Sequence, residues 1–97
     1  MALRYSFKSQ FQTAFDKLPK NRQSLTLKAL EALQSHFEGK AVSHGLGVKK
    51  LYEGAGRKTF EARVTIDLRI VWVETNEEVV FALIGSHDDV RRFLKSL

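Results

Sequence analysis

The apolar residues of this chain change their spacing once, near its middle, and this change constrains the fold more than any other feature. In residues 6–37 they recur every three or four positions, which puts them on one face of a helix. From Val48 onward the period approaches two, as in strands that bury one face. A chain with helices first and strands afterwards is expected to have an α+β fold rather than alternating parallel strands.

Two helices are expected in the first half, after a short strand in residues 1–7. The first helix has Ser6 as its N-cap, and Pro19 ends it and suits the first turn of the next helix. The second helix is predicted from Lys20 to Phe37, where Gly39 stops it. The first apolar stripe comprises Phe7, Phe11, Ala14, Phe15 and Leu18, and the second comprises Leu27, Leu30, Leu33 and Phe37. The two helices are expected to form a hairpin whose apolar side covers a sheet.

The second half is expected to form an antiparallel sheet. A loop in residues 41–47 precedes it, and turns are predicted at residues 54–57 and 75–78, which carry glycine or polar residues. The predicted strands begin at Leu51, continue through Phe60, Ala62 and Val64, and then cover Leu68 to Glu74 and Val79 to Ile84. The last of these is a nearly continuous apolar run, which is typical of a central strand covered on both faces.

A short final helix, Asp89 to Leu97, is predicted after the sheet, with Ser86 or Asp88 as its cap. The order of elements is therefore β-α-α-β-β-β, followed by this helix. The 97 residues are expected to form a single domain, residues 1–97, because they leave no room for a second.

The charge balance favours an anionic partner. The chain has 16 Lys and Arg against 11 Asp and Glu, a net charge of +5, which suits nucleic acid, an acidic protein segment or a membrane surface. Solubility alone is the alternative explanation. There is no cysteine and the three histidines lie far apart in sequence, so neither a metal nor a cofactor is expected. The apolar runs are far shorter than the roughly 20 residues that span a bilayer. The N-terminus lacks the pattern of a signal peptide, so a soluble, cytoplasmic protein is expected.

Two arginines, Arg63 and Arg69, flank the turn around Asp67. Each alternates with apolar residues, so both are expected to project from the outer sheet face, directly opposite each other if the register is symmetric. Like charges this close are unfavourable unless an anion lies between them, and the planar guanidinium fork suits a phosphate diester. The alternative is a solvated sheet face on which Glu61 or Asp67 neutralises the arginines.

His87 follows the expected central strand, after Gly85 and Ser86. A histidine at the carboxyl end of a strand is well placed to act as a general acid or base. The alternatives are a structural or merely exposed histidine, with Asp88 as a helix cap.

Four further basic residues lie around the glycine turn and form an expected basic edge: Lys49, Lys50, Arg57 and Lys58. Such an edge suits backbone phosphates and carries no means of reading bases. A solvated surface is the alternative explanation.

Several motifs together carry a resemblance to a known family. They are the helical hairpin, the strand end Glu61-Ala62-Arg63-Val64, the segment Asp67-Leu68-Arg69-Ile70-Val71-Trp72, and Val79 to Gly85 with a histidine shortly after. In this pattern the chain resembles the RelE/ParE family of bacterial toxins, over almost its whole length and most strongly from Phe60 to Phe93. The resemblance implies a RelE-like fold, with an N-terminal strand and helical hairpin packed on a curled antiparallel sheet.

The resemblance is strongest to the ribonuclease branch, the RelE, YoeB and YafQ types. It implies the toxin of a type II toxin–antitoxin system, an endoribonuclease that cuts mRNA in the ribosomal A site. In such cleavage the ribose 2′-hydroxyl attacks the adjacent phosphate. The implied partners are mRNA, the ribosome and a cognate antitoxin, the last in a toxin–antitoxin hetero-oligomer.

Matching positions imply roles for individual residues. Arg69 matches the family's phosphate-binding arginine, Arg63 a basic position on the preceding strand, and His87 a general acid near the C-terminus. Asp67 matches an acidic turn residue of YafQ-like members, and Lys50 falls near the position of a proposed base.

One departure from the family pattern concerns the residue that stacks on a base. Active members often carry Tyr or Phe soon after the histidine, where this chain has Arg91, and the first aromatic residue is Phe93. Either Arg91 stacks through its guanidinium plane, or Phe93 does, or the site is weakened.

A non-nucleolytic module is the alternative function. ParE-type members poison DNA gyrase and need no cleavage residues. Some RelE-like domains carry a signature similar to His87-Asp88-Asp89 without evident toxicity, as protein-binding modules. The alternative is therefore a gyrase-inhibiting toxin or a protein-binding domain.

Overall fold

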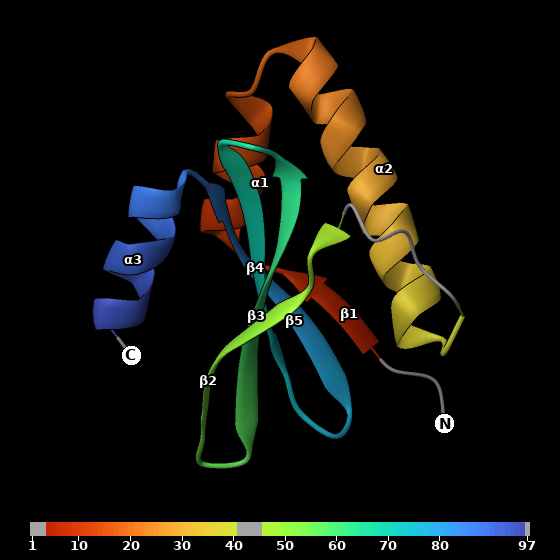
Figure 1. Ribbon diagram of the computed structural model, residues 1–97, viewed down its shortest axis with the longest axis vertical. Helices are drawn as coiled ribbons and strands as arrows, with labels where there is room; N and C mark the ends of the chain where they lie inside the picture. Colours follow the sequence, from red (N-terminus) through yellow and green to blue (C-terminus); the bar gives the residue numbers. More distant parts are fainter. Residues whose placement is uncertain (1–3, 41–45, 97) are drawn as a thin grey trace.

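The computed structural model describes residues 4–40 and 46–96, and it shows an α+β fold built on a single sheet (Figure 1). The strands lie in the order β1-β5-β4-β3-β2. The elements in chain order are β1 (Arg4–Phe7), α1 (Ser9–Asp16), α2 (Lys20–Phe37), β2 (Lys49–Gly54), β3 (Arg57–Thr65), β4 (Leu68–Glu74), β5 (Glu78–Gly85) and α3 (His87–Lys95). The predicted fold class, the helical hairpin and the final helix are confirmed. Four strands follow the hairpin, so the predicted order β-α-α-β-β-β was one strand short.

The sheet is mixed rather than wholly antiparallel. Strands β2 to β5 pair with antiparallel neighbours, as predicted, whereas β1 lies parallel to β5, with Arg4 opposite Glu78. The three antiparallel pairings from β2 to β5 make β2 and β5 run in opposite directions, so β1, which is parallel to β5, runs antiparallel to β2. Register shifts interrupt all three antiparallel pairings. Such bulges bend strands and increase their twist, which accounts for the curl of the sheet.

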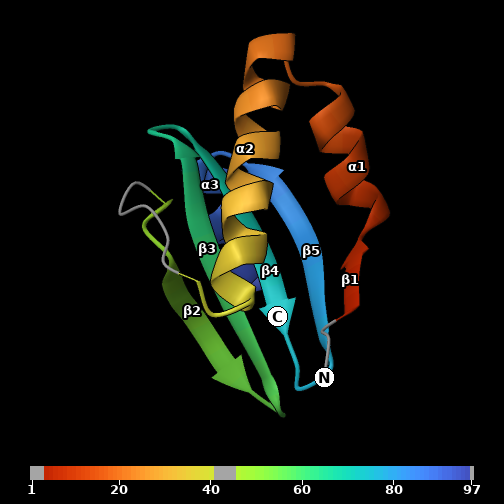
Figure 2. The ribbon, with the colours of Figure 1, turned by 90° about the vertical axis from the view of Figure 1, so that its right-hand side faces the viewer.

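Helices cover the two faces of the sheet unequally. The α1–α2 hairpin lies on one face and the shorter α3 on the other (Figure 2). The main core lies under the hairpin, where Trp72 is fully buried and stacks on Phe60 with ring centroids 5.7 Å apart. Three further buried apolar residues, Val71, Ala82 and Val90, lie outside this core. In the part of the chain that is described, no helix is long and apolar enough to cross a membrane.

The predicted start of the first helix was wrong. Ser6 and Phe7 belong to β1, and α1 begins at Ser9 with Lys8 as its N-cap residue. The backbone N–H of Lys8 donates to the carbonyl of Phe81 at 2.9 Å, so pairing with β5 continues past the predicted cap. Residues 1–3 of the predicted strand, and most of the predicted loop in residues 41–47, lie outside the described residues.

The inner face of α2 also differs from the prediction. Leu27 is 52% exposed, and the buried residues of the helix are Thr26, Ala29 and Leu33. The hydroxyl of Thr26 donates to the carbonyl of Arg22 at 2.8 Å, which satisfies this polar group inside the core. Leu33 is buried, as predicted, and Leu30 and Phe37 are partly buried against the core, so the predicted stripe fails only at Leu27.

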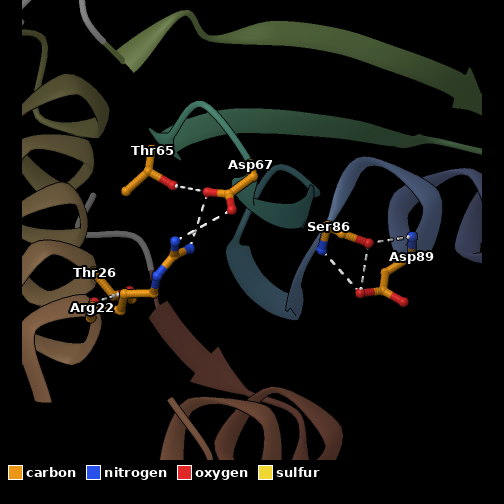
Figure 3. Close-up of polar contacts among 6 residues, drawn as sticks. All are labelled: Arg22, Thr26, Thr65, Asp67, Ser86 and Asp89. Carbon is orange, nitrogen blue, oxygen red and sulfur yellow. Dashed lines mark hydrogen bonds and ion pairs between the residues drawn. The ribbon is translucent and has the colours of Figure 1, made fainter. Parts of the chain in front are cut away.

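The turn between β3 and β4 is tied to the start of α2. Both terminal nitrogens of Arg22 donate to the Asp67 carboxylate, at 3.0 and 3.2 Å, and the Thr65 hydroxyl donates to it at 2.6 Å (Figure 3). These hydrogen bonds, those from Arg22 first, lower the pKa of Asp67 from 3.8 to about 2. The contact joins residues 45 positions apart in sequence and so connects the helical layer to the sheet.

The variant Asp67→Asn tests this connection. The folded-state pKa is the lower one, so the ion pair stabilises the fold fully above about pH 4 and less as the pH falls towards 2. Wild type should therefore be more stable than Asp67→Asn in urea titrations at pH 7, and the difference should shrink by pH 2.5. Equal stability at pH 7, or a difference that persists unchanged in acid, would contradict this account.

Candidate functional site

Strand pairing decides which charged side chains share a face of the sheet. On β3, Arg57, Glu61 and Arg63 occupy alternate positions and therefore point to the same side, away from the core residue Ala62. Lys49 of β2 lies opposite Glu61. This side is the one that α3 partly covers. We call its four cations, Lys49, Arg57, Arg63 and Arg69, the basic face.

The two arginines that flank the turn face each other, as predicted. Arg63 lies directly opposite Arg69, and Arg69 in turn lies opposite Gly85 of β5. One row across three strands therefore runs from Arg63 through Arg69 to the carboxyl end of β5. The row ends two residues before His87.

A buried carboxylate holds one of these arginines. Arg69 Nη1 lies 3.0 Å from Glu61 Oε2, and the two side chains are only 19% and 8% exposed. The Nε atom of Arg69 is buried and has no hydrogen-bond partner among the described residues. A guanidinium carries five N–H donors, so this single ion pair leaves Arg69 able to bind an anion.

The alternative reading of the arginines, a neutralised sheet face, holds for one of them. Glu61 neutralises Arg69, whereas Asp67 binds Arg22 and neither of the paired arginines. Arg63 is exposed and forms no ion pair within residues 4–40 and 46–96. From the sequence, Glu61 was expected only as a residue that could neutralise the arginines. Glu61 is only 6% exposed and lies beside an arginine, and the period-two alternation of the sequence does not predict this burial.

His87 is exposed and is the first residue of α3, two residues earlier than the predicted start of that helix. The helix begins earlier because Ser86 and Asp89 form a capping box (Figure 3). The Ser86 hydroxyl accepts from the Asp89 N–H at 3.2 Å, and the Asp89 carboxylate accepts from the Ser86 N–H at 2.9 Å. Hydrogen bonds from the Ser86 backbone and then its side chain lower the pKa of Asp89. The predicted cap at Ser86 is confirmed.

Gly85 is needed for this cap. A Cβ atom at this position would lie 2.6 Å from Asp89 Oδ2 and 2.9 Å from Asp89 Cβ, closer than side-chain contacts allow. The absence of a side chain therefore lets Asp89 fold back over β5. Because His87 lies between Gly85 and Asp89, the cap also fixes where the histidine leaves the sheet.

The remaining predicted site residues are divided by the sheet. Lys50 lies opposite the core residue Phe60, and its ammonium binds Glu53 at 2.7 Å, so it points to the hairpin side. Lys58 alternates with Arg57 and shares the side of Lys50. The structure therefore brings Lys49 and Arg57 to the face of Arg63 and Arg69, and places Lys50 and Lys58 on the other face.

Arg57 lies at one end of the basic face, and Arg91 lies on α3. Arg57 is six residues from Arg63 along β3, about 20 Å at the usual rise of a strand. Arg91 is exposed on α3, with its guanidinium 3.9 Å from Asp88. Among the described residues, no group of three His, Asp or Glu side chains is arranged to hold a metal ion.

Substitutions at the cap of α3 test its role. Gly85→Ala and Ser86→Ala should each lower the free energy of unfolding by about 1 kcal/mol, the usual worth of a helix cap. In ¹H–¹⁵N spectra, the shifts should centre on residues 86–90. Ser9→Ala is the matched control, because α1 begins without a side-chain cap. A Gly85→Ala protein with unchanged stability and an unchanged Asp89 amide signal would refute the role of the glycine.

Known proteins match this chain through structure alone. No protein-family model and no curated protein sequence matches it. The archaeal RelE–RelB complex from Pyrococcus horikoshii OT3 matches with a TM-score of 0.66 and 19% identity, over 89% of this chain and 96% of that one. The YoeB dimer from Staphylococcus aureus matches with a TM-score of 0.66 and 19% identity, over 90% of this chain and 99% of that one. The E. coli DinJ–YafQ complex matches with a TM-score of 0.63 and 14% identity, over 92% of this chain and 98% of that one. The chain therefore has the fold of the RelE, YoeB and YafQ toxins.

Proposed function

We propose that this protein is the toxin of a type II toxin–antitoxin system and an endoribonuclease that cleaves mRNA. The observation that carries the proposal is the row of Arg63, Arg69 and Gly85 across three strands, which ends beside His87. Two guanidinium groups opposite each other favour an anion between them. A phosphate diester fits this requirement, and a histidine nearby can transfer a proton.

The proposed reaction needs charge stabilisation and a proton donor. The ribose 2′-oxygen forms a bond to the adjacent phosphorus and loses its proton to solvent, while the bond from phosphorus to the 5′-oxygen breaks. Arg63 and Arg69 stabilise the negative charge that develops on the phosphoryl oxygens. Imidazolium at His87 donates a proton to the departing 5′-oxygen, so the products are a 2′,3′-cyclic phosphate and a 5′-hydroxyl. Lys50, on the other face, has no part in this step.

The proposed substrate is mRNA in the ribosomal A site. The net charge of +5 and the exposed Lys49, Arg57 and Arg63 of the basic face support binding of an RNA-rich surface. A nuclease confined to the ribosome needs no deep pocket of its own, because ribosomal RNA surrounds the substrate. This agrees with the exposed positions of Arg63 and His87.

A cognate antitoxin is the proposed protein partner, and the E. coli DinJ–YafQ structure is such a toxin–antitoxin complex. The hairpin side of this chain has an apolar groove of about 330 Å³ between β1 and α2. Tyr5, Phe7 and Leu27 line it and are 38%, 40% and 52% exposed. Large apolar side chains gathered at a surface indicate a protein contact. The proposed antitoxin site therefore lies on the face opposite the nuclease site.

The nuclease site is tested by variants that leave the fold intact. Arg63→Ala should lower mRNA cleavage by about 10²- to 10³-fold, because it removes one charge that stabilises the transition state. His87→Ala should lower it by about 10²- to 10⁴-fold. Lys58→Ala, on the same strand as Arg63 but on the other face, is the control. Cleavage is measured by primer extension on a translated message, and full cleavage by both Arg63→Ala and His87→Ala would refute the site.

Arg69 needs a paired design because its removal also leaves a buried charge. Arg69→Gln alone should destabilise the protein by about 3–5 kcal/mol, since Glu61 loses its partner. The double variant Glu61→Gln/Arg69→Gln replaces the ion pair with neutral amides and should recover most of this stability. Cleavage should remain lost in the folded double variant.

A non-nucleolytic module is the second candidate, and two observations favour it. Glu61 already neutralises Arg69, and Arg91 occupies the position where a stacking aromatic residue is expected. Such a protein would inhibit gyrase or bind another protein. Growth arrest with intact mRNA and altered DNA supercoiling would support this candidate over the nuclease.

A further inference from the structure

A second hollow lies on the same side of the sheet as the paired arginines. It has a volume of about 480 Å³ and lies between the C-terminal half of α3 and strands β2 to β4. Its lining includes Tyr52 and Thr59 from the β2–β3 hairpin, Val73 from β4 and Phe93 from α3.

Strand register places the hollow in line with the nuclease site. Thr59 lies opposite both Tyr52 and Val73, so these three residues form one row across the sheet. Arg63 is four residues further along β3 on the same face, about 13 Å away at the usual rise of a strand. A polymer bound at the arginine pair therefore has the hollow along its path.

The chemistry of the lining suits a nucleotide. Tyr52 is 51% exposed, and Phe93 is partly buried on the facing helix. Two cations, Lys8 and Arg57, also line the hollow, whereas none of its described lining residues is Asp or Glu. Aromatic rings next to cations are the combination that binds bases and phosphates of single-stranded nucleic acids.

The Tyr52 ring lies next to Gly54. A Cβ atom at Gly54 would lie 3.0 Å from the Tyr52 hydroxyl and 3.3 Å from its ring carbon Cε2. The ring therefore lies back along its own strand over Gly54, and the absence of a side chain at Gly54 leaves room for it there.

We propose that this hollow binds the base of a nucleotide neighbouring the cleaved one in single-stranded RNA. The base stacks on Tyr52 and Phe93, and Arg57 and Lys8 bind its backbone phosphate. The identity of the substrate rests on the proposed nuclease function, whereas the location of the second contact rests on the hollow itself. The hollow thus supplies the aromatic contact that Arg91 does not.

The test measures binding of 2′-O-methyl oligonucleotides of mixed sequence and increasing length. They lack the attacking hydroxyl and cannot be cleaved, so anisotropy at low salt reports binding alone. For wild type, affinity should rise sharply once the chain is long enough to reach the hollow. Tyr52→Ala should remove this rise, with binding of the longer oligonucleotides about 5- to 150-fold weaker. The shortest ones should bind as before.

Two further variants separate stacking from folding. Tyr52→Phe keeps the ring and should bind like wild type. Leu25→Ala, the control, removes an exposed apolar side chain from α2, on the opposite side of the sheet, and should also leave binding unchanged. Arg63→Ala should weaken binding at every length.

The outcomes distinguish the two proposals. If Tyr52→Ala binds every length like wild type while Arg63→Ala does not, the hollow is no RNA subsite and the nuclease site stands. If no oligonucleotide binds the wild-type protein, the hollow proposal fails together with the proposed RNA substrate.

Discussion

Glu61 and Arg69 form an ion pair on β3 and β4 that is largely withdrawn from solvent, at 3.0 Å. A carboxylate this buried is tolerated only with a partner, so Arg69 is held at the sheet surface rather than extended into solvent. Because Arg69 lies opposite both Arg63 and Gly85, its position sets the geometry of the whole row. One guanidinium is thus anchored and the other, at Arg63, is exposed. This arrangement fixes one side of the proposed anion site and leaves the other free to close on its ligand.

The two faces of the sheet carry the two proposed binding surfaces. The hairpin side contains the main core around Trp72 and the apolar groove proposed for an antitoxin. The other side contains the basic face, His87 and the hollow under α3. The Arg22–Asp67 ion pair connects the start of α2 to the β3–β4 turn, so the core side holds in place the strand ends that carry the paired arginines. Partner binding and RNA binding are therefore expected to use different surfaces of one rigid sheet.

Local patterns in the sequence predicted much of this site. Period-two alternation and the short turn at Asp67 were enough to place Arg63 opposite Arg69 and both on the outer face. The same alternation separates Arg57 from Lys58, so the basic edge was too coarse a description of residues that point to opposite faces. The helix cap at Ser86 was also predicted from the sequence, because capping is a local interaction.

The errors arose where distant contacts decide the outcome. Ser6 was wrongly predicted as a helix cap. It belongs to β1, and the parallel pairing of β1 with β5 depends on residues more than 70 positions away. Leu27 was predicted to be buried, but packing on the sheet selects Thr26 instead. The burial of Glu61 and the hollow beside Tyr52 both depend on how the strands and α3 pack together. The spacing of residues in the sequence does not predict this packing.

The most direct test is a titration that observes the arginine side chains themselves. In ¹⁵N-labelled protein, the Nε–H signals of Arg63 and Arg69 should shift when an uncleavable single-stranded RNA is added. Each signal is assigned by substituting its arginine with lysine, which removes that Nε–H signal from the spectrum. Arg22, bound to Asp67, serves as an internal reference and should not move. Unchanged Arg63 and Arg69 signals at saturating RNA, or shifts confined to the opposite face around Lys58, would contradict the proposal that this face binds the RNA phosphate.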